Sequence, residues 1–111
     1  MKVTYVAGPY RAEHAWQIDL NIDKAKLFAM SIWSAGHVAL CPHLNSPHFD
    51  GLASAEAFIE GTLELMRRCD AVFVLPSSED SEGTQGEIQE AKRLGIPLFF
   101  DMPSLLDWLD S

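Results

Sequence analysis

The feature that most constrains the fold is Ala71–Leu75, a continuous run of apolar residues. A strand that is apolar at every position is typical of a sheet that is covered by other layers on both faces. Sheets of this kind are mostly parallel, and parallel strands are joined by crossovers that usually contain a helix. The run therefore predicts that strands and helices alternate along the chain.

The remaining patterns agree with such an alternation. Short apolar runs that end in turn or loop residues predict three further strands, at Lys2–Ala7, His37–Cys41 and Ile96–Phe100. Apolar periodicity and capping residues predict helices at Ala12–Ala35, from the cap Ser54 to about Arg68, at Thr84–Leu94 and at Pro103–Leu109. In the first helix one inward face is expected, formed by Ile18, Ile22, Ala25, Ala29 and Ile32.

Together these elements predict one α/β domain over residues 1–111. We expect a three-layer α/β/α sandwich around a four- to five-stranded parallel sheet, similar to a flavodoxin or Rossmann fold. In such sheets ligands bind beyond the carboxyl ends of the strands. The polar segments at that edge are Gly8–Arg11, Pro42–Gly51 and Pro76–Thr84, and the last two fall in the predicted loops Pro42–Ala53 and Pro76–Gly83.

Charge and composition exclude some classes of partner. The formal net charge is −8, which argues against a protein that binds nucleic acid polymers, because such proteins need a basic surface. No apolar run is long enough to span a membrane, and no secretory signal is visible. Cys41 and Cys69 lack the spacing of metal ligands. We therefore expect a reducing, cytoplasmic compartment and no cofactor.

The first candidate loop is Gly8-Pro9-Tyr10-Arg11, between a predicted strand and a predicted helix. Gly8 allows a ligand to approach the backbone, and the following N–H groups together with Arg11 could hold an anion. The alternative is a tight turn without a ligand, since the full glycine fingerprint of dinucleotide-binding proteins is absent.

The second candidate loop contains His43, Asn45, His48, Phe49 and Asp50. The two histidines with Asn45 and Asp50 could bind a metal, but their spacing fits no standard zinc motif. A loop that binds a base or a sugar, with Phe49 stacking on a ring, is favoured over a metal site and over a plain surface loop.

The third candidate is Glu87, which follows the loop residues Ser81 and Gly83 at the start of a predicted helix. The helix dipole and free N–H groups would keep a carboxylate there ionised at neutral pH. An ionised and positioned carboxylate is what covalent glycoside cleavage requires. The alternative is a glutamate that only complements the helix dipole.

Four blocks of the sequence carry a resemblance to a known family: Val3–Arg11, Cys41–Asn45, Arg68–Val72 and Asp80–Ile88. In this order they resemble the nucleoside 2-deoxyribosyltransferase-like family, including its short phage and bacterial members. The related 2′-deoxynucleoside 5′-phosphate N-hydrolases share the pattern. The blocks extend over nearly the whole chain.

The resemblance implies a role for each matching residue. Glu87 would attack C1′ of a deoxynucleoside, and Tyr5 would orient it. Residues Gly8 to Arg11 would hold the sugar or its 5′-phosphate, and Ser81 and Gly83 would line the same pocket. The partners implied are a small nucleoside or nucleotide and further copies of the chain, in a dimer or a tetramer.

One position departs from the family. Members commonly carry an aspartate that helps to protonate the leaving base, and by spacing back from Asp70 its place here is Thr62. Glu60, Glu64 or His43 would have to substitute, or the activity would be weak or absent. Three hypotheses follow: an enzyme acting on the N-glycosidic bond of a deoxynucleoside or its 5′-monophosphate, a non-catalytic nucleotide-binding module, and a glycohydrolase of another N-riboside such as NAD.

Overall fold

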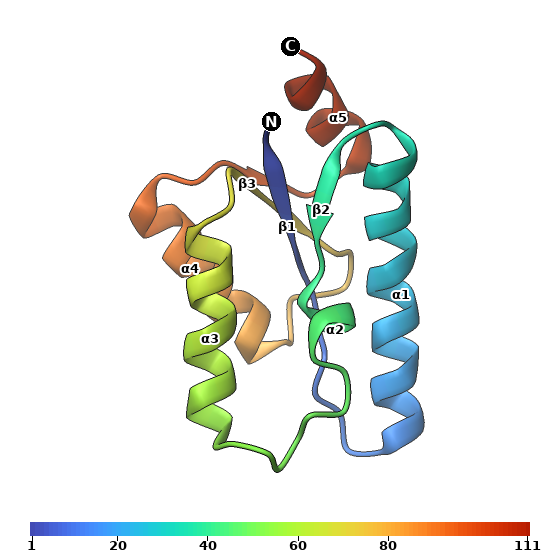
Figure 1. The fold of residues 1–111 in the computed structure, drawn as a ribbon, viewed down its shortest axis with the longest axis vertical. Coiled ribbons are helices and arrows are strands. Elements are labelled where there is room, and N and C mark those ends of the chain that lie inside the picture. Colours follow the sequence, from blue (N-terminus) through green and yellow to red (C-terminus); the bar gives the residue numbers. More distant parts are fainter.

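A computed structural model describes all residues, 1–111, and contains one parallel sheet of four strands (Figure 1). The strands are β1 (Val3–Ala7), β2 (Val38–Leu40), β3 (Ala71–Val74) and β4 (Leu98–Phe99). Their order across the sheet is β2-β1-β3-β4, and every neighbouring pair is parallel. The predicted α/β class and parallel sheet are confirmed.

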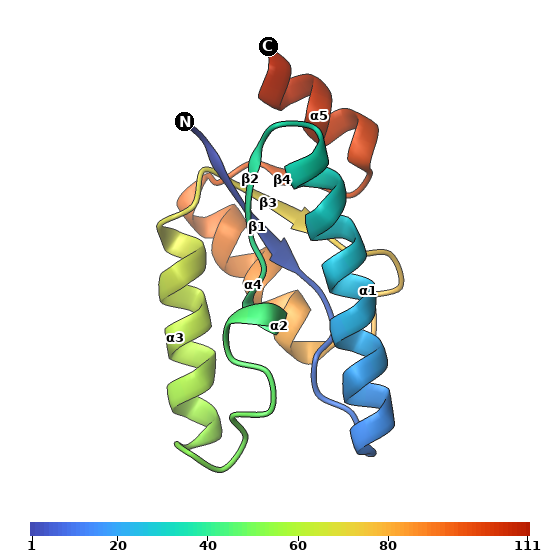
Figure 2. The ribbon, with the colours of Figure 1, turned by 45° about the vertical axis from the view of Figure 1, so that its right-hand side comes forward.

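Helices cover both faces of this sheet. They are α1 (Ala15–Ser34), α2 (Pro42–Asn45), α3 (Ala55–Arg67), α4 (Glu82–Leu94) and α5 (Met102–Asp110). Residues of α1 and α5 share one core cluster with the sheet, and residues of α3 and α4 share another. Figure 2 shows α1 and α3 on opposite sides of the strands. None of the helices has the combination of length and apolar character that a membrane crossing requires.

The side chains of β3 explain why its sequence is apolar throughout. Ala71 and Phe73 belong to the core on the side of α1, whereas Val72 and Val74 belong to the core on the side of α3 and α4. Successive residues of a strand point to opposite faces, so a strand between two helical layers has no solvent-facing position.

Several element boundaries differ from the prediction, and helix α1 begins at Ala15 instead of Ala12. The segment that begins at Pro42 opens with the short helix α2, because Pro42 occupies a first-turn position where its missing N–H has no partner to lose. Helix α4 begins at Glu82, two residues before the predicted start, because the Ser81 hydroxyl accepts the Thr84 N–H at 3.2 Å. Strand β4 is limited to Leu98–Phe99, and it pairs with β3 alone.

Two predicted helix caps, Ser54 and Gly95, are confirmed by the structure. The Ser54 hydroxyl accepts the Ala57 N–H at 3.1 Å and begins α3 as expected. Gly95 ends α4 with a φ of 74°, a left-handed conformation that glycine adopts without steric cost.

Gly8 joins β1 to the loop at the carboxyl edge of the sheet. Its position requires a glycine because the side chain of Leu75 lies close to its Cα atom. A Cβ atom added to Gly8 would lie 2.9 Å from Cδ2 and 3.1 Å from Cβ of the buried Leu75. These separations are too short for carbon atoms, so a larger residue would push β1 away from the end of β3.

We therefore predict that Gly8→Ala destabilises the protein by about 1–3 kcal/mol, the usual cost of overpacking. Chemical denaturation measures the loss. The matched control is Gly61→Ala in α3, where an added Cβ meets nothing within 4 Å. Because alanine is the better helix former, the control should be more stable by about 0.5–1 kcal/mol. Equal effects of the two substitutions would contradict the packing argument.

Candidate functional site

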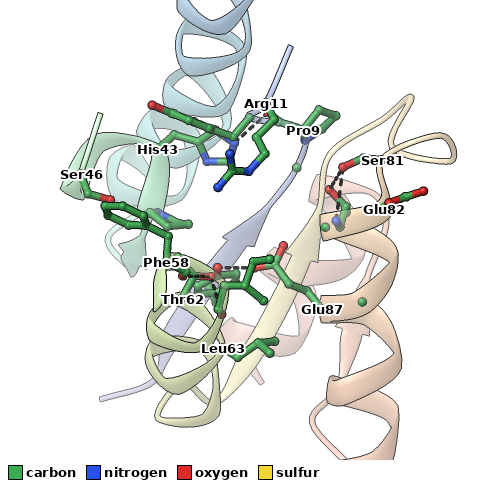
Figure 3. Close-up of a pocket in the computed structure, with 18 of the residues that line it drawn as sticks. Pro9, Arg11, His43, Ser46, Phe58, Thr62, Leu63, Ser81, Glu82 and Glu87 are labelled. Atoms are coloured by element: carbon green, nitrogen blue, oxygen red, sulfur yellow. Dashed lines mark hydrogen bonds between the residues drawn. The ribbon is translucent and has the colours of Figure 1, made fainter. Parts of the chain in front are cut away.

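A cavity of about 800 Å³ lies at the carboxyl edge of the sheet (Figure 3). All three loops that were predicted to meet there contribute to its lining, and α3 supplies a further wall. Most of the predicted site residues line it, namely Tyr5, Gly8, Pro9, Tyr10, Arg11, His43, Thr62, Ser81, Gly83 and Glu87. The volume is within the range of about 300–1,000 Å³ that is usual for small-molecule sites.

Two predicted residues lie elsewhere. Glu60 is exposed and is not part of the cavity lining. Asn45 is exposed on α2 and lines a smaller groove beside α1 instead. Both predictions were wrong about position, because the helical rotation of α3 and the unexpected helix α2 turn these side chains away from the cavity.

Tyr5 and Glu87 meet at the cavity although 82 residues separate them in the chain. Tyr5 lies in β1 and is completely buried on the face of the sheet that α3 and α4 cover. Glu87 lies in the second turn of α4 and is half-buried. The Tyr5 hydroxyl donates a hydrogen bond to Oε2 of Glu87, which fixes the carboxyl group and leaves its other oxygen free.

The prediction that Glu87 stays ionised at neutral pH was wrong. Burial raises the pKa of Glu87 to about 7, and the hydrogen bond from Tyr5 only partly offsets this rise. The helix dipole contributes little because it acts within the first turn of a helix, and Glu87 lies in the second turn. At neutral pH the carboxyl group is therefore divided between its protonated and its ionised form.

Burial, followed by the charge of Glu87, raises the pKa of Tyr5 well above its usual range. The tyrosine thus keeps its proton at all physiological pH values and remains a hydrogen-bond donor to Glu87. A neutral donor beside a carboxylate can orient it without taking a proton from it.

Thr62 lies on α3, in the wall of the cavity that also contains Phe58 and Leu63 (Figure 3). Its hydroxyl lies 3.0 Å from the carbonyl oxygens of Phe58 and of Ile59, to which it donates. A threonine hydroxyl does not ionise near neutral pH, so Thr62 can donate a hydrogen bond but cannot supply a proton as an acid.

Neither neighbouring glutamate on α3 replaces the missing acid. Glu64 accepts from Nε of Arg68 at 2.9 Å, and its pKa is lowered chiefly by this hydrogen bond. It lies outside the cavity, as Glu60 does.

His43 is also unsuited to be that acid. It is buried, and its Nε2 lies 3.0 Å from the carbonyl oxygen of Pro9, while its Nδ1 lies 3.8 Å from Sγ of Cys41. Burial lowers the pKa of His43, so the neutral ring donates from Nε2 to the carbonyl. His43 therefore connects α2 to the loop after β1 and shapes the cavity.

The second loop is tied to the first by Tyr10. Its hydroxyl donates to Asp50 at 3.1 Å and accepts the His48 N–H at 2.8 Å. His48 turns away from the cavity, and its Nε2 lies 2.8 Å from Asp19 on α1. His43 and His48 thus have different partners, and Phe49, which was expected to stack on a ring, does not line the cavity.

Charges of both signs surround the cavity. Arg11 is exposed on the rim and forms no ion pair within the chain, so its five N–H donors are available to a ligand. The lining also contains three negatively charged side chains besides Glu87, namely Asp50, Asp80 and Glu82.

Sequence reasoning missed the apolar wall formed by α3. Phe58, Ile59 and Leu63 line the cavity together with Thr62. Ile59, Thr62 and Leu63 lie one, four and five positions after Phe58, so a helix brings them to one face. This pattern is present in the sequence. Such a stripe more often packs in a core, so the pattern alone does not distinguish a cavity wall from a buried helix face.

Three comparisons with known proteins bear on this geometry. The family model described as "Domain of unknown function (DUF7768)" matches residues 2–101. No curated protein matches the chain. Among solved structures, a 2-deoxyribosyltransferase from the psychrotolerant bacterium Bacillus psychrosaccharolyticus is similar, with a TM-score of 0.63 and 23% identity over 86% of this chain and 69% of that chain. At this identity the similarity shows a shared fold.

The raised pKa of Glu87 predicts a pH dependence of stability. Between the ordinary value of 4.5 and the folded value of about 7, the folded protein holds a proton that the unfolded chain releases. The resulting stabilisation is complete below pH 4.5 and is lost as the pH rises to about 7, up to roughly 3 kcal/mol. Glu87→Gln removes this titration and keeps the shape of the side chain.

The free energy of unfolding of Glu87→Gln, relative to that of the wild type, should therefore increase between pH 5 and pH 8. Denaturant titrations at several pH values measure the difference. The titration of His43 has the opposite sign, but it is present in both proteins and cancels. A difference that is constant with pH would show that Glu87 has an ordinary pKa.

Proposed function

We propose that the chain, which belongs to the DUF7768 family, cleaves or transfers at the N-glycosidic bond of a 2′-deoxynucleoside or its 5′-monophosphate. The observation that carries the proposal is the carboxyl group of Glu87, which is held by Tyr5 at a cavity large enough for a small molecule. The fold shared with a 2-deoxyribosyltransferase supports the same class of reaction.

In the first step the ionised carboxylate of Glu87 attacks C1′ of the sugar. An oxygen–C1′ ester bond forms while the C1′–N bond breaks, and the electron pair of the broken bond leaves with the base. The base then gains a proton. Because Tyr5 donates to Oε2, the attacking atom in this proposal is Oε1.

In the second step a nucleophile attacks C1′ and releases Glu87 as a carboxylate. With water as the nucleophile the products are free deoxyribose, or its phosphate, and a regenerated enzyme. With a second base the product is a new nucleoside, and no water is consumed. Both reactions use the same glycosyl-enzyme, so the acceptor alone distinguishes a hydrolase from a transferase.

The two ends of the substrate fit different walls in this proposal. The loop from Gly8 to Arg11 holds the sugar or its 5′-phosphate, for which the unpaired Arg11 is the cationic partner. Ser81 and Gly83 complete this polar end. The base contacts the apolar wall of α3, where Phe58 offers a ring for stacking.

Thr62 supports a second candidate function, a nucleotide-binding module without catalysis. No carboxyl group of α3 lines the cavity, so a leaving base would receive its proton from solvent or from one of the loop carboxylates. We propose further that the chain assembles as a homo-oligomer, because exposed residues such as Arg11 and Glu82 form part of the cavity lining and are accessible to a second chain.

The first functional prediction concerns turnover. Incubation with deoxynucleosides and their 5′-monophosphates, with and without an acceptor base, should release free base or form a new nucleoside. Because the ionised form of Glu87 reacts, kcat/KM should rise with pH and level off above about 7. Glu87→Gln should abolish turnover and retain nucleoside binding in calorimetry. Liquid chromatography of the products measures both reactions.

The same assay separates the alternatives. A folded wild-type protein that binds nucleotides but turns over none of them supports the binding module. Release of nicotinamide from NAD, without cleavage of deoxynucleosides, supports the other glycohydrolase. Turnover that Glu87→Gln leaves unchanged is incompatible with a reaction at this carboxyl group.

The second functional prediction concerns the missing acid. Thr62→Asp places a carboxyl group in the wall of the cavity and should raise kcat/KM for base release by roughly 10²–10⁴-fold, the usual contribution of a positioned acid. Thr62→Asn is the matched control, with the same shape and no ionisable proton. If the two variants turn over at equal rates, protonation of the base does not limit the reaction.

A further inference from the structure

The cavity at the carboxyl edge of the sheet contains more negative than positive side chains. Its lining has four carboxyl groups and one permanent cation, which belong to Asp50, Asp80, Glu82, Glu87 and Arg11. None of these side chains forms an ion pair within the chain. Carboxylates that no cation of the protein balances favour a positively charged ligand and disfavour an anionic one.

Glu87 differs from the other three carboxyl groups because it alone is not exposed. Its hydrogen-bond partner is the hydroxyl of Tyr5, which carries no charge. At neutral pH the carboxyl group is partly protonated, since burial disfavours its charge and no cation of the chain lies against it. A positive charge on a ligand in the cavity would favour the ionised form, which is the form that attacks C1′.

The leaving base is the second group for which a positive charge matters. When the C1′–N bond of a neutral nucleoside breaks, the base takes the electron pair and needs a proton. The wall formed by α3 offers only Thr62, whose hydroxyl does not act as an acid near neutral pH. A base that already carries a positive charge takes the same electron pair and leaves as a neutral molecule, so it needs no proton.

The walls of the cavity also suit a flat cation. Phe58 on α3 and Glu87 on α4 belong to facing walls (Figure 3). Tyr10, in the loop after β1, adds a second aromatic ring to the lining. The face of an aromatic ring attracts a cation through its quadrupole, so these rings would bind a cationic base more tightly than a neutral base of the same size.

We propose that the preferred substrates are nucleosides whose base carries a fixed positive charge and whose sugar carries no phosphate. Because Glu87 is taken as the nucleophile, this substrate class rests on the proposed function. Nucleosides of N7-alkylated purines and of pyridinium rings have such a base, and both bases become neutral when they leave. Phosphate groups, including the pyrophosphate of NAD, would add negative charge beside the carboxylates of the lining.

The reaction of such a nucleoside balances without an acid. Oε1 of Glu87 forms an ester bond to C1′ while the C1′–N bond breaks, and the electron pair of that bond neutralises the positive charge of the base. Water then attacks C1′, the ester bond breaks, and Glu87 returns as a carboxylate. Each turnover therefore yields one neutral base, one free sugar and one proton, which passes to the solvent.

Calorimetry with two small probes tests the charge preference without turnover. 1-Methylnicotinamide is a fixed pyridinium cation, 3-methylbenzamide is a neutral molecule of the same shape, and neither has a sugar. Near pH 7 the wild type should bind the cation roughly tenfold more tightly. It should also release protons on binding, because Glu87 becomes ionised, and the heat of binding should therefore depend on the buffer.

Glu87→Gln should lose the proton release and most of the preference for the cation, since the glutamine has no charge to offer. Circular dichroism establishes that the variant is folded. Equal affinity of the wild type for the two probes would overturn the proposed substrate class. Proton release that persists in Glu87→Gln would show that another group responds to the cation, and this would exclude the proposed role of Glu87.

A pair of neighbouring variants separates the charge of the cavity from the charge of the whole chain. Asp80→Asn removes a carboxylate of the lining and should weaken binding of 1-methylnicotinamide roughly twofold to fivefold, with no change for 3-methylbenzamide. The matched control is Glu79→Gln, which removes an exposed carboxylate outside the lining and should leave both affinities unchanged. An equal loss in both variants would assign the preference to the net charge of −8 and contradict a cavity specific for cations.

Turnover of a matched set of nucleosides completes the test. The set contains 7-methyl-2′-deoxyguanosine in mildly acidic buffer, where its base is a cation, with nicotinamide 2′-deoxyriboside, 2′-deoxyguanosine and NAD. After subtraction of spontaneous cleavage, kcat/KM of the cationic deoxynucleosides should exceed that of 2′-deoxyguanosine by roughly 10²-fold or more, since they need no acid. Thr62→Asp should raise kcat/KM for 2′-deoxyguanosine and leave the values for the two cationic deoxynucleosides unchanged.

The outcomes distinguish this substrate class from the proposed function itself. Cleavage of only one of the two cationic deoxynucleosides supports the class and identifies the base as a purine or a pyridinium ring. If 2′-deoxyguanosine is cleaved as fast as both of them, the substrate class is wrong and the proposed function stands. If NAD is cleaved faster than nicotinamide 2′-deoxyriboside, the exclusion of phosphate is wrong. If none of the set is cleaved, the proposed function fails, and the substrate class fails with it.

Discussion

β1 and β3 lie in the middle of the sheet, and the side chains of β3 are buried alternately against helices on its two faces. The rest of the molecule depends on this two-sided burial. It forces the connections between strands to pass over the sheet as helices, and it brings the carboxyl ends of β1 and β3 next to one another. Gly8 and Leu75, the residues that follow these strands, are in contact for this reason.

The candidate site is a direct consequence of the same burial. Tyr5 is in β1, so its ring is part of the core while its hydroxyl reaches the edge of the cavity. Helix α4 packs on that face of the sheet and brings Glu87 to the hydroxyl. The carboxyl group is thereby partly removed from water, which raises its pKa, and it accepts one hydrogen bond from the neutral tyrosine. The hydrogen bond between Tyr5 and Glu87 thus connects the core of the fold to the candidate catalytic carboxyl group.

Local sequence patterns predicted much of the fold. The apolar run at Ala71–Leu75 predicted a doubly covered strand, and the structure has β3 there. Ser54 and Gly95 predicted the ends of helices, since caps are recognised by residue type. The convergence of the polar loops was also predictable, because the carboxyl ends of parallel strands share one edge. The short helix α2 was missed, because its segment is rich in residues that are typical of loops.

By itself the sequence determined the α/β class, the order of the strands and of the four longer helices, and the edge of the sheet where polar loops gather. These properties depend on hydrophobic periodicity and on capping, which act over a few residues. Only the tertiary structure decided which side chains face the cavity, that His43 is neutral and bonded to Pro9, and that the pKa of Glu87 is raised to about 7. The physical reason is that burial and hydrogen bonding depend on distances between segments far apart in the chain, such as the contact between Tyr5 and Glu87.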